Sequence, residues 1–146
     1  MSEALSDDGI RDDGIHGNDI RGGCICGAIR YRCDAAPEFS ILCQCRQCQR
    51  ITGAGHAASF AVAAAATTIS GRLRFHAQTA DSGNTVRSGF CADCGAPVMK
   101  TTTKLPRTLF FHAATLDDPS RFKPQMVVYA DAKQPWDHVD PKLPRR

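Results

Sequence analysis

The chain has 146 residues, a formal net charge of +3 and eight cysteines. This length allows one domain to bury a core without needing disulfides or metals merely to stay folded. The most apolar stretch, FAVAAAA at 60–66, is too short to cross a bilayer, and the amino terminus lacks the basic and apolar pattern of a secretory signal. We therefore expect a cytoplasmic protein without a membrane segment.

Residues 1–19 are predicted to form a disordered acidic tail. They contain six acidic residues and one arginine, with little that a core could bury. Removing their charge of −5 from the total leaves +8 on residues 20–146, which we predict to be the folded domain.

The rest of the chain consists of short extended segments separated by Gly, Pro, Asp and Asn, without a long stretch of helical period. A mainly β fold is predicted, with two packed antiparallel sheets that resemble a β-sandwich. The alanines of 62–66 allow a helix, but Thr67, Thr68 and Ile69 favour an extended segment. DDPSRF at 117–122 is typical of a turn or a single helical turn. About eight strands are expected, at 28–33, 39–42, 57–63, 73–77, 85–90, 97–100, 108–113 and 125–129.

The cysteines fall into three groups, and Cys33 stands apart as a small, partly buried strand residue. In a reducing compartment, thiols are more often metal ligands or catalytic groups than disulfides. Cysteines one or two residues apart also suit a metal better than a disulfide to each other. The groups are Cys24 and Cys26 in GGCICG, Cys43, Cys45 and Cys48 in LCQCRQC, and Cys91 and Cys94 in FCADCG.

Two of these groups together supply four ligands for a closed, structural zinc site. In FCADCG the thiols are three residues apart, and Gly95 allows a turn that directs both sulfurs to one metal. In GGCICG the alternate positions of an extended segment place both thiols on one face. The predicted structural ligands are Cys24, Cys26, Cys91 and Cys94.

An alternative partition pairs Cys45 and Cys48 with Cys91 and Cys94 in a zinc ribbon. The 42 residues between Cys48 and Cys91 exceed the usual ribbon spacing of about 15–20. We therefore favour the first partition, which leaves Cys43, Cys45 and Cys48 as a separate group.

Three thiolates leave one coordination position of a tetrahedral zinc ion open. An open site can polarise a carbonyl or accept an incoming thiol and hold it as thiolate, so it indicates sulfur and carbonyl chemistry. Among nearby residues His56 is the best fourth ligand, although a hydrogen-bonded loop histidine is the more frequent outcome. The alternative is a second structural zinc with an unrecognised ligand; His76 and His112 have the pattern of ordinary strand residues.

Several motifs in order resemble the family of glutathione-dependent formaldehyde-activating enzymes, which also includes centromere-protein-V-like members. They are GGCICGAIRYRC, CQCRQC followed by TGAG, GFCADCGAPV, ATLDDPSRFKPQMVVY and KQPW, which together cover about residues 21–144. The family often has Cys-His-Cys in the central group and Arg-Lys after its last cysteine, where this chain has Gln44, Gln49 and Arg50.

The resemblance implies a zinc-dependent carbon–sulfur lyase with a fold shared by small-GTPase accessory factors. It implies two zinc ions per chain, one structural and one catalytic, with glutathione or a similar thiol as substrate and a small carbonyl such as formaldehyde. The expected product is S-hydroxymethylglutathione, and Cys45 is the residue assigned to catalysis. The implied structural ligands are the four named above, and the catalytic ligands are Cys43, Cys45 and Cys48.

Arginines next to the open group are candidates for binding the carboxylates of glutathione, since the guanidinium fork suits bidentate contacts. Arg46 and Arg50 flank the last ligand and are the two we single out, ahead of the more distant Arg72, Arg74, Arg87 and Lys100. We expect Trp136 to pack against the sandwich and Asp117 and Asp118 to form a turn.

Two other functions were weighed. One is a zinc-stabilised binding module for nucleic acid or another acidic partner, but the chain lacks an arginine-rich run or an aromatic stacking platform, so nucleic acid is not the expected partner. The other is a redox protein with a reversible Cys45–Cys48 disulfide. Exposed sheet edges are compatible with a homodimer.

Overall fold

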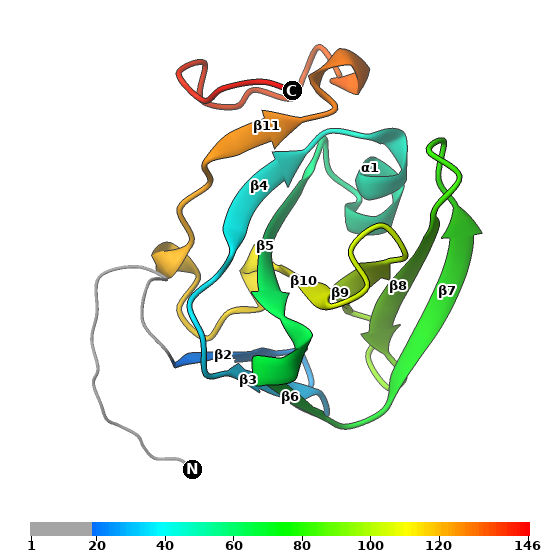
Figure 1. The fold of residues 1–146 in the computed structure, drawn as a ribbon, viewed down its shortest axis with the longest axis vertical. Coiled ribbons are helices and arrows are strands. Elements are labelled where there is room, and N and C mark those ends of the chain that lie inside the picture. The colour runs from blue at the N-terminus through cyan, green and yellow to red at the C-terminus, as the bar shows by residue number, and fades with distance from the viewer. Residues whose placement is uncertain (1–18) are drawn as a thin grey trace.

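The computed structural model of the protein describes residues 19–146. The predicted acidic tail therefore lies outside the described residues, apart from Asp19. The described part of the chain forms two β-sheets of seven and three strands (Figure 1). This arrangement confirms the mainly β fold with two sheets, and the number of strands is ten in place of about eight.

The large sheet has the strand order β11-β4-β5-β10-β9-β8-β7. Every neighbouring pair is antiparallel except β11 and β4, which run parallel, so the expectation of purely antiparallel sheets is wrong at this edge. The parallel pair arises because β11 follows a crossover from β10 past the intervening strands, whereas a hairpin would give an antiparallel neighbour. The strands are β4 Phe39–Cys43, β5 Ala57–Ala63, β7 Leu73–Thr79, β8 Thr85–Cys91, β9 Pro97–Thr102, β10 Thr108–His112 and β11 Met126–Val128.

The small sheet consists of β2 Ile20–Gly23, β3 Arg30–Cys33 and β6 Thr67–Ser70, with β3 in the middle. Strand β6 confirms the extended segment predicted after the alanines. Strand β2 was not predicted, because two of its four residues are glycines, which are poor strand formers. Gly22 is required there, since a Cβ atom would overlap the hydroxyl of Tyr31 and the carbonyl of Thr115.

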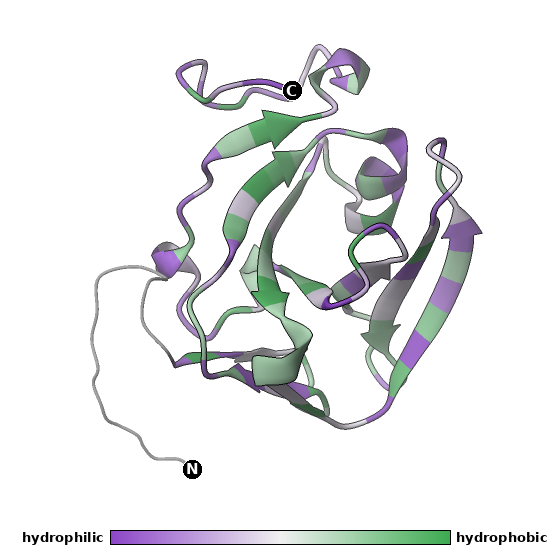
Figure 2. Cartoon of the chain, in the orientation of Figure 1, coloured by the Kyte–Doolittle hydropathy of each residue, from purple (hydrophilic) through white to green (hydrophobic). Residues whose placement is uncertain are grey.

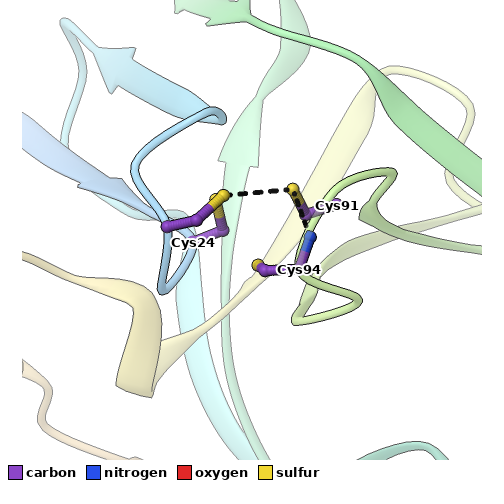
Figure 3. Close-up of side chains that lie close together, drawn as sticks. Cys24, Cys91 and Cys94 are labelled. Carbon is purple, nitrogen blue, oxygen red and sulfur yellow. Dashed lines mark hydrogen bonds between the residues drawn. The ribbon is translucent and has the colours of Figure 1, made fainter.

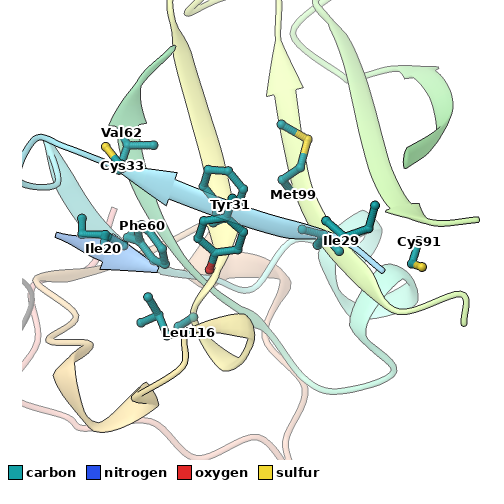
Figure 4. Close-up of a cluster of buried hydrophobic side chains, with 12 residues drawn as sticks. Ile20, Ile29, Tyr31, Cys33, Phe60, Val62, Cys91, Met99 and Leu116 are labelled. Atoms are coloured by element: carbon teal, nitrogen blue, oxygen red, sulfur yellow. The ribbon is translucent and has the colours of Figure 1, made fainter. Parts of the chain in front are cut away.

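The main hydrophobic core lies between the two sheets (Figure 4). The ring of Tyr31 stacks on Phe111 with a centroid distance of 3.9 Å, and Phe60 stacks on the same ring at 5.9 Å. Cys33 is fully buried in this cluster, so it is a core residue of β3, whereas the sequence predicted a partly buried strand residue. Strand β7, at the edge of the large sheet, instead alternates between hydrophilic and hydrophobic residues (Figure 2).

A second apolar cluster lies on the opposite face of the large sheet. It forms where the short helix α1, Arg46–Thr52, packs on that face, and it contains Ile41, Cys43, Cys48, Ala57, Ala61 and Phe110. Helix α1 was not predicted, because seven residues are too few to show a helical period. It ends at Gly53, whose φ of 71° is left-handed and favours glycine.

The remaining elements are 3₁₀ turns that connect the strands. The turn predicted at DDPSRF is confirmed, with the Asp118 side chain accepting a hydrogen bond from the amide of Ser120. The expectation that Trp136 packs against the sandwich is wrong, because Trp136 is 62% exposed in the irregular carboxy-terminal segment. The turns are η1 Ala64–Ala66, η2 Ala113–Thr115, η3 Pro119–Arg121 and η4 Ala130–Ala132.

Among the described residues, none of the helices has the length and apolar character needed to span a membrane.

Replacing Phe111 by alanine should destabilise the domain by about 3–5 kcal/mol, since it opens a cavity between the stacked rings of the core. The free energy of unfolding in urea measures this loss. Leu105→Ala is the control: Leu105 is 37% exposed in a turn, so its truncation should cost less than about 0.5 kcal/mol. Similar losses for both variants would contradict the assignment of the core.

Candidate metal centres and the adjoining cavity

Four cysteines from two distant parts of the sequence meet at one end of the domain. Their sulfur atoms all lie within 4.8 Å of one another. The Sγ atom of Cys26 lies 3.6 Å from that of Cys24 and 3.8 Å from that of Cys91. Figure 3 shows Cys24 facing Cys91 and Cys94 across the gap between the two loops. The structure thus brings together the four residues that spacing assigned to one site.

Each pair of cysteines sits on a tight turn that contains a left-handed glycine. Gly27 follows Cys26 with a φ of 81°, and Gly95 follows Cys94 with a φ of 77°. Backbone amides then point at sulfur: Ile29 donates to Cys24 at 3.2 Å, and Asp93 and Cys94 donate to Cys91 at 3.3 and 3.4 Å. Such donors stabilise thiolates, the form of cysteine that binds metal.

The electrostatic balance at Cys24 shows this effect. Slight desolvation opposes ionisation of its thiol, but the Ile29 amide and the neighbouring cysteines outweigh it and lower the pKa of Cys24 to about 6. A closed set of four sulfur donors, at least one of them readily ionised, fits a structural zinc ion.

The second group is formed by Cys43 at the end of β4, Cys45 at the amino-terminal cap of α1 and Cys48 in the first turn of that helix. The three sulfur atoms also lie within 4.8 Å of one another. The Sγ of Cys45 accepts a hydrogen bond from the amide of Cys48 at 3.3 Å. The strand end and the helix cap therefore fold one short sequence into a three-sulfur cluster.

No fourth protein ligand joins this cluster among the histidines, cysteines, aspartates and glutamates of the described residues. His56, the best candidate from the sequence, is instead hydrogen-bonded to Asp137. The donors fit zinc, which favours thiolate, and a tetrahedral ion held there would keep one position open.

Lys100 on β9 lies against the three-sulfur cluster. Its Nζ atom is 3.7 Å from the Sγ of Cys48 and lies 5.5 Å from the centroid of the Phe110 ring. Burial opposes the charge of the ammonium, but the attraction of the three thiols outweighs it and raises the pKa of Lys100. In Cys45 the neighbouring thiols and the Cys48 amide lower the pKa, and the charge of Lys100 lowers it further.

The sequence did not single out Lys100 for this role. In the sequence, Lys100 was only one of several distant cations. Its contact with the cluster depends on the pairing of β9 with β10, which places Lys100 opposite Phe110. No local pattern reveals that register.

Two buried glutamines connect helix α1 to the carboxy-terminal segment. The Nε2 of Gln49 donates to the carbonyls of Gln44 and Ala132 at 2.8 and 3.1 Å. Its Oε1 accepts hydrogen bonds from Arg46 at 2.6 Å and from Gln134 at 3.1 Å. Gln44 and Gln49, which differ from the usual family pattern, thus hold the carboxy-terminal segment next to the three-sulfur cluster.

Arg46 and Arg50 both lie on the exposed side of α1. Arg46 is engaged with Gln49, and neither arginine lines the large cavity described next. Binding of substrate carboxylates by these two residues stays a prediction.

A cavity of about 620 Å³ lies between the four-cysteine loop, the end of α1 and η2. At its edge, the guanidinium of Arg30 donates to both carboxylate oxygens of Asp117 at 2.8 and 2.6 Å. Two histidines, His56 and His112, also line it. Burial and the charge of Lys100 lower the pKa of His112 to about 4, so its ring is neutral at pH 7.

Comparisons with known proteins agree with this architecture. The family model described as glutathione-dependent formaldehyde-activating enzyme matches residues 19–132. Among solved structures, the chain is similar to a Rhodobacter sphaeroides protein determined as a structural-genomics target, with a TM-score of 0.56 and 18% identity over 86% of this chain and 99% of that one. At this identity the likeness concerns the fold alone. No curated protein matches the chain.

Replacing Lys100 by methionine should make the three-sulfur cluster less reactive once its metal has been removed. Loss of the buried cation raises the thiol pKa values, so fewer thiolates are present at pH 7, and alkylation of Cys45 by iodoacetamide should slow by about 3–10-fold. Mass spectrometry after chelation measures the rate on protein whose fold is checked by circular dichroism. Lys104→Met, in an exposed turn, is the control, and equal rates in both variants would contradict the electrostatic contact.

Proposed function

Because the chain belongs to the family of glutathione-dependent formaldehyde-activating enzymes, we propose that it is a zinc-dependent carbon–sulfur lyase. Its reaction is the reversible addition of glutathione or a similar thiol to formaldehyde or a similarly small carbonyl. The observation that supports this proposal best is the cluster of Cys43, Cys45 and Cys48, whose sulfurs lie together without a fourth ligand among the described residues.

The two cysteine groups have different roles in this proposal. Cys24, Cys26, Cys91 and Cys94 would hold a structural zinc, because four sulfurs complete its coordination. Cys43, Cys45 and Cys48 would hold the catalytic zinc. When bound there, zinc supplies a Lewis acid with one open position, which can keep an incoming thiol as thiolate.

The surroundings of the three-sulfur cluster favour an anionic sulfur substrate. Three thiolates outweigh the charge of a divalent ion by one, and a fourth thiolate would add a second negative charge. The ammonium of Lys100, 3.7 Å from Cys48, offsets one of these charges at a position with little access to water. We further propose that Arg46 or Arg50, exposed beside the cluster, contacts a carboxylate of the thiol peptide.

Replacing Cys45 by serine should remove one of two zinc ions per chain and abolish turnover while leaving the domain folded. Elemental analysis gives the zinc content, and circular dichroism reports the fold. Turnover is measured by NMR exchange between ¹³C-labelled formaldehyde hydrate and S-hydroxymethylglutathione, because the uncatalysed addition also proceeds and must be subtracted. In the wild type, dialysis against glutathione should make one zinc more labile.

Two control variants separate the roles of the thiols. Cys91→Ser removes a ligand of the closed site that joins the two sheets, so cooperative unfolding should be lost. Cys33→Ser changes a cysteine outside both groups, and two zinc ions should remain. Loss of fold in Cys45→Ser equal to that in Cys91→Ser would contradict the division of roles.

A further inference from the structure

A histidine and an aspartate that are distant in sequence form a close pair at the large cavity. The Nδ1 atom of His56 lies 3.0 and 2.9 Å from the two carboxylate oxygens of Asp137. The Asp137 side chain is only 10% exposed, and it also accepts a hydrogen bond from the Nε2 of Gln44 at 3.0 Å. Partial burial opposes ionisation, but the bonds from Gln44 and His56 outweigh it and lower the pKa of Asp137.

The carboxylate of Asp137 fixes how the imidazole of His56 carries its proton. A carboxylate accepts hydrogen bonds only, so Nδ1 must carry a proton, and in the neutral form of the ring Nε2 holds the lone pair. The ring makes no other hydrogen bond among the described residues, and His56 lines the cavity with a side-chain exposure of 26%. Nε2 is therefore available to a molecule bound in the cavity.

The local chain is shaped to allow this pair. Gly55 precedes His56, and a Cβ atom at that position would overlap the carboxyl group of Asp137. The hydroxyl of Thr52 donates to the carbonyl of Cys48 at 2.8 Å and contacts the carbonyl of His56 at 3.2 Å. Since Cys48 and Thr52 are about one helical turn apart, this link fixes His56 beside the helix that presents the three sulfurs.

A purely structural tether does not require this arrangement. The carboxy-terminal segment is already attached to α1 through the bonds of Gln49 to Ala132 and Gln134. If the pair served only to attach the carboxy-terminal segment, there would be no reason for Nε2 of His56 to remain without a hydrogen-bond partner at the cavity. A histidine oriented by a partly buried carboxylate, with its other nitrogen free, is the arrangement of a general acid–base catalyst.

We propose that His56 is the general acid–base residue of the thiol addition and that Asp137 positions it, with the sulfur of the thiol at the three-sulfur cluster and the carbonyl and the rest of the thiol peptide in the cavity next to His56. The cavity size, about 620 Å³, is in the range for small-molecule sites. This inference rests on the proposed function and names the residue that moves the proton.

The proton balance of the step closes without another reactant. As the thiol binds, Nε2 of His56 takes its proton, and an electron pair of the resulting thiolate then forms the C–S bond. The carbonyl π pair moves to oxygen, and the imidazolium returns the proton to the resulting alkoxide. Nothing is oxidised or reduced, and the ring of His112 lies at the same cavity in its neutral form, where it can donate a hydrogen bond to the carbonyl oxygen.

The test compares exchange rates of the zinc-loaded wild type with those of four variants. His56→Gln should lower the maximal rate by about 10²-fold or more, because general acid–base catalysis supplies about 10²–10⁴-fold, with half-saturation by glutathione changed less than twofold. Asp137→Asn and Gly55→Ala should lower the rate in the same direction by about tenfold without changing His56 itself. His76→Gln is the matched control, since His76 is exposed on β7 and lies outside the cavity lining.

A second readout does not depend on activity. In ¹⁵N-histidine-labelled protein, glutathione should shift the Nε2 signal of His56, identified by its absence in His56→Gln. Asp137→Asn should change the balance of the two His56 tautomers at unchanged thermal stability. The shift caused by glutathione is the result that a merely structural role would not give.

The outcomes separate this inference from the proposed function. If the wild type is active and the maximal rate of His56→Gln is within twofold of the wild-type rate, the acid–base role is overturned and the proposed function stays in place. An inactive wild type overturns the proposed function. If glutathione still shifts the His56 signal in that case, the cavity is supported as a thiol-peptide site that includes His56. If glutathione causes no shift, this binding site is overturned as well.

Discussion

The structure depends most on the meeting of four sulfur atoms from two distant parts of the sequence. Cys26 and Cys91 are 65 positions apart, yet their sulfurs are 3.8 Å from each other. The first pair belongs to the loop of the small sheet and the second to the large sheet, so one bound ion would join the two layers. Because a cross-link over so long a loop restricts the unfolded chain strongly, such an ion would add to the stability supplied by the hydrophobic core.

The same cross-link also forms a wall of the cavity. Gly23 at the end of β2 and Cys24 and Ile25 in the loop that follows all line the cavity. Cys24 packs against the main core, whereas Ile25 is 88% exposed, so a metal ion held by the four sulfurs would help to fix the position of this wall. A structural site would thus also shape the space where substrates are proposed to bind.

Strand periodicity separates the core from the chemistry within the large sheet. In β10, Phe111 belongs to the cluster between the sheets, whereas Phe110 packs with Cys43 and Cys48 on the other face. His112 follows with the same parity as Phe110 and lines the cavity. The three consecutive residues FFH therefore alternate between the two faces of the large sheet. A shift of one residue in register would move each side chain to the opposite face.

Local spacing was sufficient to predict the cysteine groups and most strands, because ligand pairs and short β segments are encoded over a few residues. The partition of seven cysteines into four and three agrees with the way their sulfurs cluster. The contacts of Lys100 with Cys48 and of His56 with Asp137 join residues 52 and 81 positions apart. They depend on strand register and on the path of an irregular carboxy-terminal segment, which no local pattern encodes.

Gln44 shows how the departures from the family pattern fit together. It lies between two metal-ligand positions and is fully buried, and its amide nitrogen donates to Asp137 while its Oε1 has no partner in the described part of the chain. An unpartnered buried carbonyl costs about 1–3 kcal/mol, so the amide is held in this orientation against a penalty. The reverse orientation would direct Oε1 at the carboxylate of Asp137, and two acceptors would repel. Asp137 thus sets the orientation of a residue between two sulfur ligands while it orients His56, so the sulfur cluster and the cavity share one carboxylate.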